Sequence, residues 1–134
     1  MIIQDVTPFT LLVKKCDNTG CDPFHARKLP KSVLNRIEVA DVVFISAASI
    51  WEAGIKINQG RLEANVDGLF EGIAASSFIE LPISATHSIL AANLPEHHRD
   101  PFDRMLIAQA MSEPLKLLTA DGLLRQYSEL VEVI

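Results

Sequence analysis

Short apolar runs alternate with amphipathic helical segments along most of the chain, and this alternation constrains the fold more than any other feature. The clearest pair is a β-branched run at 42–45, typical of a buried strand, followed by a helix expected over 47–59. Ser46 is a good N-cap for that helix, and Gly60 stands just past its end. The same patterns predict further strands at 78–81, 115–118 and 131–134, and helices near 30–38, 66–76, 84–93, 101–112 and from 121 onward. The sequence therefore predicts an α/β fold, a three-layer α/β/α sandwich with a mostly parallel central sheet.

The helix expected near 66–76 carries four apolar residues at positions i, i+3, i+4 and i+7. We expect them to form one buried face, made of Val66, Leu69, Phe70 and Ile73. This helix and the one at 84–93 also hold enough apolar residues to form a partner-binding face, which core burial explains equally well.

Size and charge limit the classes of function. The 134 residues suit one domain spanning 1–134, in which residues 1–28 are atypical and contain at most one or two short strands. The net charge of −5 argues against a general nucleic-acid coat protein but permits an enzyme with a few local cations and a bound metal.

Because no apolar run approaches the ~20 residues that span a bilayer, and the first residues lack signal-peptide order, we expect a cytoplasmic protein without membrane contact. We expect Cys16 and Cys21 to be reduced thiols.

The stretch 97–110 is a charged loop that runs directly into an amphipathic helix. Asp100 is a good N-cap, and Pro101 suits the first helical position, where its missing N–H costs nothing. Asp103 then falls at the third helical position, where its carboxylate faces the free N–H groups of the first turn. This crowding of charge predicts either a strongly capped helix start or a site for metal and phosphate.

Acidic residues follow several of the predicted strands. Glu52 lies in the helix after the 42–45 strand, Asp103 in the first turn of its helix, and Asp121 directly after the 115–118 strand. Functional sites of parallel α/β sheets form at the carboxyl ends of the strands, so these three carboxylates can converge if the strands are neighbours. Converging carboxylates repel one another unless a hard cation such as Mg²⁺ or Mn²⁺ neutralises them. Such an ion polarises a phosphodiester and lowers the pKa of bound water.

Each acid also has an ordinary structural interpretation. Glu52 can pair with Lys56 at i+4, a surface pair worth about 0.3–0.5 kcal/mol. Asp103 and Asp121 can simply cap their helices. Spacing alone therefore favours caps over a metal site.

Three further side chains invite a functional interpretation that their spacing does not support. His97 and His98 are not at metal-ligand spacing and are expected to lie in a solvated loop. Trp51 is expected in the core rather than as a base-stacking platform, because it stands at apolar helical spacing.

The amino-acid sequence of several segments favours the metal site over simple helix caps. The Ser-Ala-Ala-Ser-Ile-Trp-Glu helix start and the His-Arg-Asp-Pro-Phe-Asp-Arg-Met-Leu-Ile-Ala-Gln-Ala string resemble the PIN-domain toxins of the VapC type. The likeness spans about 29–134, and its other matching segments are 60–62, 81–83 and 118–121.

The resemblance implies a metal-dependent endoribonuclease that cleaves RNA and is held inactive by a cognate antitoxin, with a homodimer as the expected assembly. Glu52, Asp103 and Asp121 would be the catalytic acids that bind Mg²⁺ or Mn²⁺. Asp100 either assists them or only caps its helix.

The resemblance also implies contacts to RNA and to the attacking water. Arg99, Arg104 and Lys56 would be the local cations for RNA phosphates. Thr119 would orient a metal-bound water.

The N-terminal segment departs from the family pattern, which opens with an apolar strand ending in a metal-binding aspartate. Asp5 and Asp17 are the two candidates for that position. If neither fills it, the metal loses a ligand and the sheet a strand, and the chain becomes a catalytically impaired relative that folds and binds an antitoxin or itself. A third hypothesis is a structural α/β domain whose acids are only caps.

Overall fold

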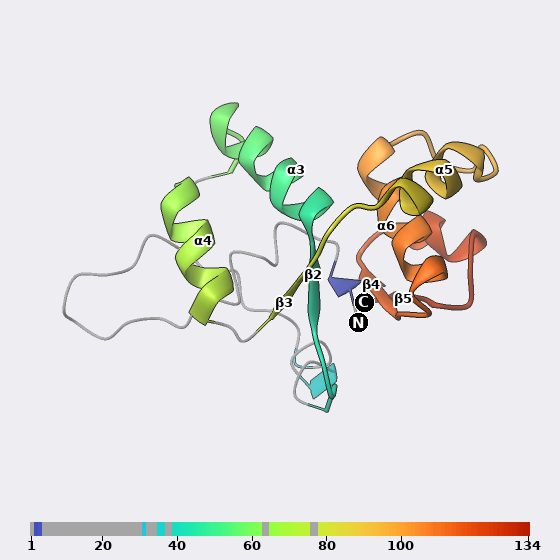
Figure 1. The fold of residues 1–134 in the computed structure, drawn as a ribbon, viewed down its shortest axis with the longest axis horizontal. Coiled ribbons are helices and arrows are strands. Elements are labelled where there is room, and N and C mark those ends of the chain that lie inside the picture. Colours follow the sequence, from blue (N-terminus) through green and yellow to red (C-terminus); the bar gives the residue numbers. More distant parts are fainter. Residues whose placement is uncertain (1, 4–30, 32–34, 37–38, 63–64, 76–77) are drawn as a thin grey trace.

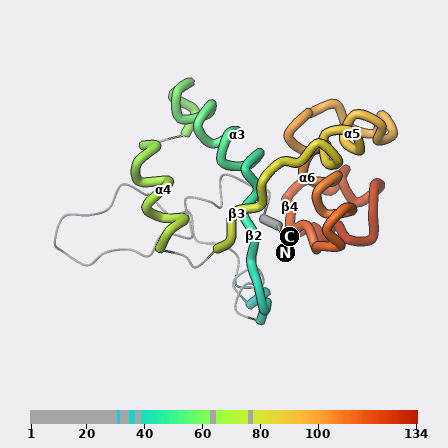
Figure 2. The backbone as a smooth tube through the Cα atoms, viewed as in Figure 1, coloured from blue at the N-terminus to red at the C-terminus, as the bar shows by residue number. Residues whose placement is uncertain are grey.

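Parallel strands form one sheet at the centre of the molecule (Figures 1 and 2). The computed structural model describes residues 2–3, 31, 35–36, 39–62, 65–75 and 78–134. Within these residues the sheet has the order β3-β2-β1-β4-β5, and every neighbouring pair is parallel. The strands are β1 (Ile2–Ile3), β2 (Phe44–Ser46), β3 (Ile79–Leu81), β4 (Leu117–Thr119) and β5 (Val131–Val133). The predicted parallel sheet is confirmed.

Helices cover the sheet on two sides. The described helices are α3 (Ala47–Asn58), α4 (Val66–Ala75), α5 (Ala85–Asn93), α6 (Pro101–Ser112) and the 3₁₀ turn η1 (Gly122–Gln126). In Figure 1, α3 and α4 lie on one side of the strands, and α5 and α6 lie on the other. None of the described helices is long and apolar enough to cross a membrane.

Each side of the sheet has its own apolar core. Ile45 of β2 packs with Ala53 of α3 and Leu69 of α4. The preceding residue, Phe44, packs into the other core, which includes Leu106 of α6 and residues of α5, β4 and η1. Neighbouring residues of a strand point to opposite faces, so a sheet with two covered faces needs apolar residues at consecutive positions. The predicted α/β/α sandwich is confirmed.

The central strand of the sheet comes from the first residues of the chain. Ile2 pairs with Phe44 of β2 and with Leu117 of β4, and Ile3 pairs with Leu118. The expectation that an atypical N-terminus removes a strand from the sheet is therefore wrong. Asp5 and Asp17 lie outside the described residues.

A buried polar group links α6 to the strands. The Ser46 hydroxyl donates to Oε1 of Gln109 at 2.6 Å, and the Gln109 amide nitrogen lies 3.4 Å from the Leu81 carbonyl and 3.3 Å from the Pro82 carbonyl. Ser46 also caps α3 as predicted, because its Oγ accepts the Ala48 N–H. The buried amide thus finds partners for both of its ends, as an interior polar group requires.

Several predicted elements differ in detail. In α4 only part of the expected face is covered, because Val66 is 40% exposed and Phe70 is 60% exposed. The predicted last helix is the short 3₁₀ turn η1, which follows Asp121. Near 30–38 the described residues, among them Arg36, are helical, and the rest of the predicted helix lies outside the described residues.

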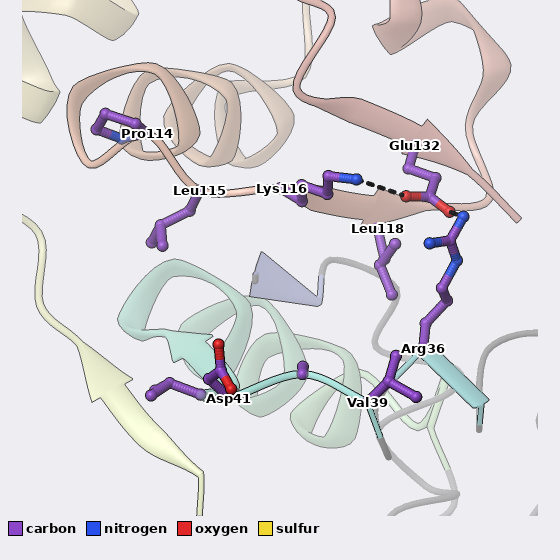
Figure 3. A pocket seen from close by; sticks show the side chains of 10 residues that line it. Arg36, Val39, Asp41, Pro114, Leu115, Lys116, Leu118 and Glu132 are labelled. Carbon is purple, nitrogen blue, oxygen red and sulfur yellow. Dashed lines mark ion pairs between the residues drawn. The ribbon is translucent and has the colours of Figure 1, made fainter.

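A hollow of about 310 Å³ lies at the edge of the sheet where β2 and β4 begin. Glu132 of β5 lies between two cations (Figure 3), and its carboxylate oxygens are 2.6 Å from Arg36 and 3.9 Å from Lys116. Val42 and Leu118 are among its other lining residues. These ion pairs connect β5 to the helical residue Arg36. They lie toward the amino-terminal ends of the parallel strands, whereas the predicted acids follow the carboxyl ends.

Candidate metal centre

Two of the predicted acids and one histidine meet beyond the carboxyl end of β4. Each of His98, Asp103 and Asp121 offers one ligand atom, and these atoms all lie within 4.8 Å of one another. Nε2 of His98 hydrogen-bonds Oδ2 of Asp103 and lies 3.7 Å from Oδ2 of Asp121. The three side chains come from the loop before α6, the first turn of α6 and the turn after β4. We call these three residues the acid–histidine cluster.

The start of α6 positions Asp103. Oδ1 of Asp100 accepts the N–H of Phe102 at 2.8 Å and the N–H of Asp103 at 3.4 Å, and Pro101 stands in the first helical position. The predicted helix start is confirmed. Because the N-cap fixes the first turn, the Asp103 carboxylate is held beside the positive end of the helix.

The turn after β4 positions Asp121 in a similar way. Its N–H donates to Oγ1 of Thr119 at 3.0 Å, and its own Oδ1 accepts the Leu123 N–H at 2.8 Å. The second oxygen, Oδ2, is the one that faces His98. Thr119 is buried, and its hydroxyl holds the turn that carries this carboxylate. The placement of Thr119 supports a positioning role, and its predicted contact with a metal-bound water stays a prediction.

The loop that carries His98 is fastened by Arg104. The guanidinium of Arg104 donates to several backbone carbonyls, those of Ala91, Ala92, Leu94, Pro95 and His98, at distances from 2.7 to 3.5 Å. Both of its terminal nitrogens are therefore used within the chain. This geometry gives Arg104 a structural role, and its predicted contact with an RNA phosphate stays a prediction.

Tyr127 holds the same loop from the other side. Its hydroxyl accepts the His98 N–H at 2.7 Å and donates to the Pro95 carbonyl at 2.9 Å. Its ring packs edge-on against His97, with ring centroids 5.1 Å apart. The backbone of His98 is thus bonded at both its N–H and its carbonyl, which fixes the point from which the imidazole reaches the acids.

Glu52 lies at the margin of the acid–histidine cluster. Its carboxylate pairs with Lys56 at 2.7 Å, and the two side chains are 17% and 27% exposed. The ring of Trp51 meets the ring of Phe102 at 5.1 Å in an edge-to-face contact, which brings the second turn of α3 against the start of α6. Glu52 is also close enough to Asp103 for its charge to act on that carboxyl. The predicted Glu52–Lys56 pair is confirmed.

The electrostatics of the cluster disfavour an ionised Asp103. Burial raises the pKa of Asp103 above its ordinary value of 3.8, and the nearby charges of Asp100 and Glu52 raise it further, while the hydrogen bond and charge of His98 act in the opposite direction. Negative charge that is partly withdrawn from water is stabilised by a cation. The balance of these effects therefore favours the binding of a positive ion beside Asp103.

The donor set fits a divalent metal ion. Two carboxylate oxygens and one imidazole nitrogen lie close enough together to bind the same ion, and all three side chains are partly exposed. Asp103 and Asp121 would hold the ion, with Glu52 and His98 beside them. Carboxylate and imidazole ligands of this kind suit divalent cations that activate water and polarise phosphate esters.

The other predicted RNA contacts lie around this cluster. Arg99 is exposed and lines a hollow of about 370 Å³ together with Glu96, His98 and Arg104. Lys56 is the ion-pair partner of Glu52. The predicted contacts of Arg99 and Lys56 with RNA phosphates stay predictions.

Two expectations about aromatic side chains are wrong. Trp51 is 63% exposed, so it is not a core residue. His98 does not lie in a purely solvated loop, because it is 21% exposed and contacts both acids. The sequence does hold a signal for His98, since the residue stands two positions before the N-cap of a helix whose first turn carries an acid.

Comparison with known proteins agrees with this architecture. The PIN domain family model matches residues 22–130, which is well over half of the chain. No curated protein matches the chain. The match covers the cluster residues and Glu52, and the chain therefore belongs to the PIN domain family.

Proposed function

We propose that the protein is a metal-dependent endoribonuclease that acts as the toxin of a toxin–antitoxin pair. PIN domains are generally metal-dependent nucleases. The observation that carries the proposal is the meeting of His98, Asp103 and Asp121 beyond the strand ends, with Glu52 beside them. The proposed partners are an RNA substrate, a cognate antitoxin and a second copy of this chain.

In this proposal each side chain has a limited task. Asp103 and Asp121 hold the ion, Mg²⁺ or Mn²⁺, which supplies Lewis-acid polarisation of a phosphodiester and a lower pKa for bound water. Glu52 adds negative charge beside the ion and is in turn held by Lys56. Arg99, exposed at the edge of the neighbouring hollow, offers a charge-assisted contact for an RNA phosphate.

Glu52→Gln tests the catalytic part of the proposal. We expect RNA cleavage in Mg²⁺ or Mn²⁺ to fall about 10- to 100-fold, because the substitution removes a charge beside the ion while preserving side-chain shape. Glu71→Gln is the matched control, since Glu71 is an exposed acid on α4 outside the cluster. Cleavage of a single-stranded RNA would be followed with and without EDTA. Equal activity of the Glu52 variant and the control would remove Glu52 from the site.

Trp51 offers a test of where RNA binds. The exposed Trp51 ring contacts Phe102 in the first turn of α6, the turn that also carries Asp103. Base stacking on an aromatic ring is worth ~1–3 kcal/mol, and we expect Trp51→Ala to weaken RNA binding about tenfold or more. Phe70→Ala is the matched control, because Phe70 is a similarly exposed ring on α4.

Trp51 is the only tryptophan of the chain, so its fluorescence reports on its own surroundings. Titration with single-stranded RNA in EDTA is expected to quench this emission, in the wild type and in the Phe70 variant alike. Unchanged emission at saturating RNA would place the RNA elsewhere.

A catalytically impaired PIN protein is the second candidate. It is supported by the partners that the chain itself supplies to its acids, because Lys56 pairs with Glu52 and His98 hydrogen-bonds Asp103. Calorimetry decides between the two, since a well-folded protein that binds neither Mg²⁺ nor Mn²⁺ would be the impaired form.

A further inference from the structure

The imidazole of His98 stands where a ligand of the metal would stand. Its Nε2 touches Oδ2 of Asp103 and lies 3.7 Å from Oδ2 of Asp121, so the nitrogen faces the same space as both acids. The side chain is only 21% exposed although it belongs to a loop. Its position therefore calls for an explanation beyond that of a surface histidine.

The backbone around His98 is held more firmly than capping of α6 requires. Tyr127 accepts the His98 N–H, and Arg104 binds the His98 carbonyl at 3.2 Å. Asp100 alone supplies the N-cap of the helix. The additional bonds fix the loop, and a fixed loop presents the imidazole to the two carboxylates from a constant distance.

The neighbouring histidine has a different environment. His97 is exposed, and its ring packs against the Tyr127 ring instead of facing the acids. The two residues share a loop and a side-chain type, so they form a natural pair of test and control.

The chemistry of the donor set bears on the identity of the ion. Mg²⁺ prefers oxygen ligands and keeps much of its water, whereas imidazole nitrogen is a good ligand for transition metals. Mn²⁺ accepts carboxylate oxygen and also binds more tightly than Mg²⁺ to a site that includes nitrogen.

We infer that His98 is a nitrogen ligand of the metal ion held by Asp103 and Asp121, and that it makes the site prefer Mn²⁺ to Mg²⁺. This inference rests on the proposed function only in that an ion binds between the two acids. The alternative is that His98 stays outside the coordination sphere and only hydrogen-bonds the Asp103 carboxylate.

Electron spin-echo envelope modulation of the Mn²⁺-loaded protein, free of any histidine tag, separates these possibilities. A directly bound imidazole gives ¹⁴N modulation of the Mn²⁺ signal. We expect this modulation in the wild type and in His97→Gln, and we expect its loss in His98→Gln. Mn²⁺ bound without ¹⁴N modulation in the wild type would overturn the inference and leave the proposed nuclease intact.

Calorimetric titration of the same three proteins tests selectivity without reference to activity. Because the glutamine amide that replaces the imidazole offers oxygen in place of nitrogen, we expect His98→Gln to weaken Mn²⁺ binding about tenfold or more and Mg²⁺ binding by less than about threefold. Equal losses for both ions would overturn the selectivity. Absence of binding of either ion to the wild type would overturn the inference and the proposed function together, and thermal unfolding of each variant checks its fold.

Discussion

Asp103→Asn is expected to reduce metal-dependent RNA cleavage at least about a thousandfold while stabilising the metal-free fold at pH 7. The carboxylate is one of the proposed ligands, and loss of an ion that contributes several kcal/mol to transition-state stabilisation explains an effect of this size. The stabilisation has a separate cause, because the folded protein disfavours the ionised form of this partly buried carboxyl.

The sign of the stability effect follows from the raised pKa of Asp103. Between pH 3.8 and the higher pKa of the folded state, the folded chain binds a proton that the unfolded chain has released. Stability therefore falls as the pH rises through this window, and the loss persists at pH 7. Asn removes the titrating group and with it this loss.

Thermal unfolding in EDTA at pH 4 to 7 measures the effect. We expect the midpoint of Asp103→Asn to lie above that of the wild type at pH 7, and the difference to shrink toward pH 4. Added Mn²⁺ is expected to raise the midpoint of the wild type but not that of the variant. The Glu71→Gln control should follow the wild type. A variant that is less stable than the wild type at pH 7 would contradict the proposed cost of ionising Asp103.

Arg104→Met is expected to destabilise the protein by about 2–4 kcal/mol. The guanidinium binds carbonyls from Ala91 to His98, and methionine keeps the aliphatic length but leaves those carbonyls without their donor. The loop that carries His98 then loses its main attachment to α6. Urea unfolding measures the change in stability.

Arg99→Met provides the matched comparison. Arg99 is an exposed arginine in the same loop. We expect this variant to unfold like the wild type and to bind RNA more weakly, with a smaller dependence of affinity on salt. Arg104→Met with unchanged stability and weakened RNA binding would contradict the structural role and support the prediction that Arg104 contacts the substrate.

The start of α6 shows how much local chemistry can be predicted from sequence. An N-cap aspartate, a proline in the first turn and apolar residues at helical spacing are all local signals, and α6 runs from Pro101 to Ser112 as predicted. The strand order is predictable only as a class, because pairing depends on contacts between distant segments.

The candidate site was less accessible to sequence reasoning. Sequence spacing identifies Asp103, in the first turn of a predicted helix, and Asp121, directly after a predicted strand. It does not identify His98 as part of the site. The position of His98 depends on a loop that folds back onto Arg104 and Tyr127, and hydrophobic periodicity carries no information about such a loop. The prediction that Trp51 is a core residue is wrong for a related reason. Helical spacing identifies an apolar face, but it does not show which turns of the helix are covered by neighbouring elements.

The Gln109 amide determines more than the packing of the core. Both of its ends are bonded, to Ser46 on one side and to the carbonyls of Leu81 and Pro82 on the other, and the residue is fully buried. Sliding α6 by one residue along its axis would break these bonds and carry Asp103 about 1.5 Å along the same path. A metal site tolerates only displacements of its ligands that are much smaller than this shift of about 1.5 Å. The position of the partly exposed Asp103 carboxylate thus depends on the fully buried Gln109 side chain.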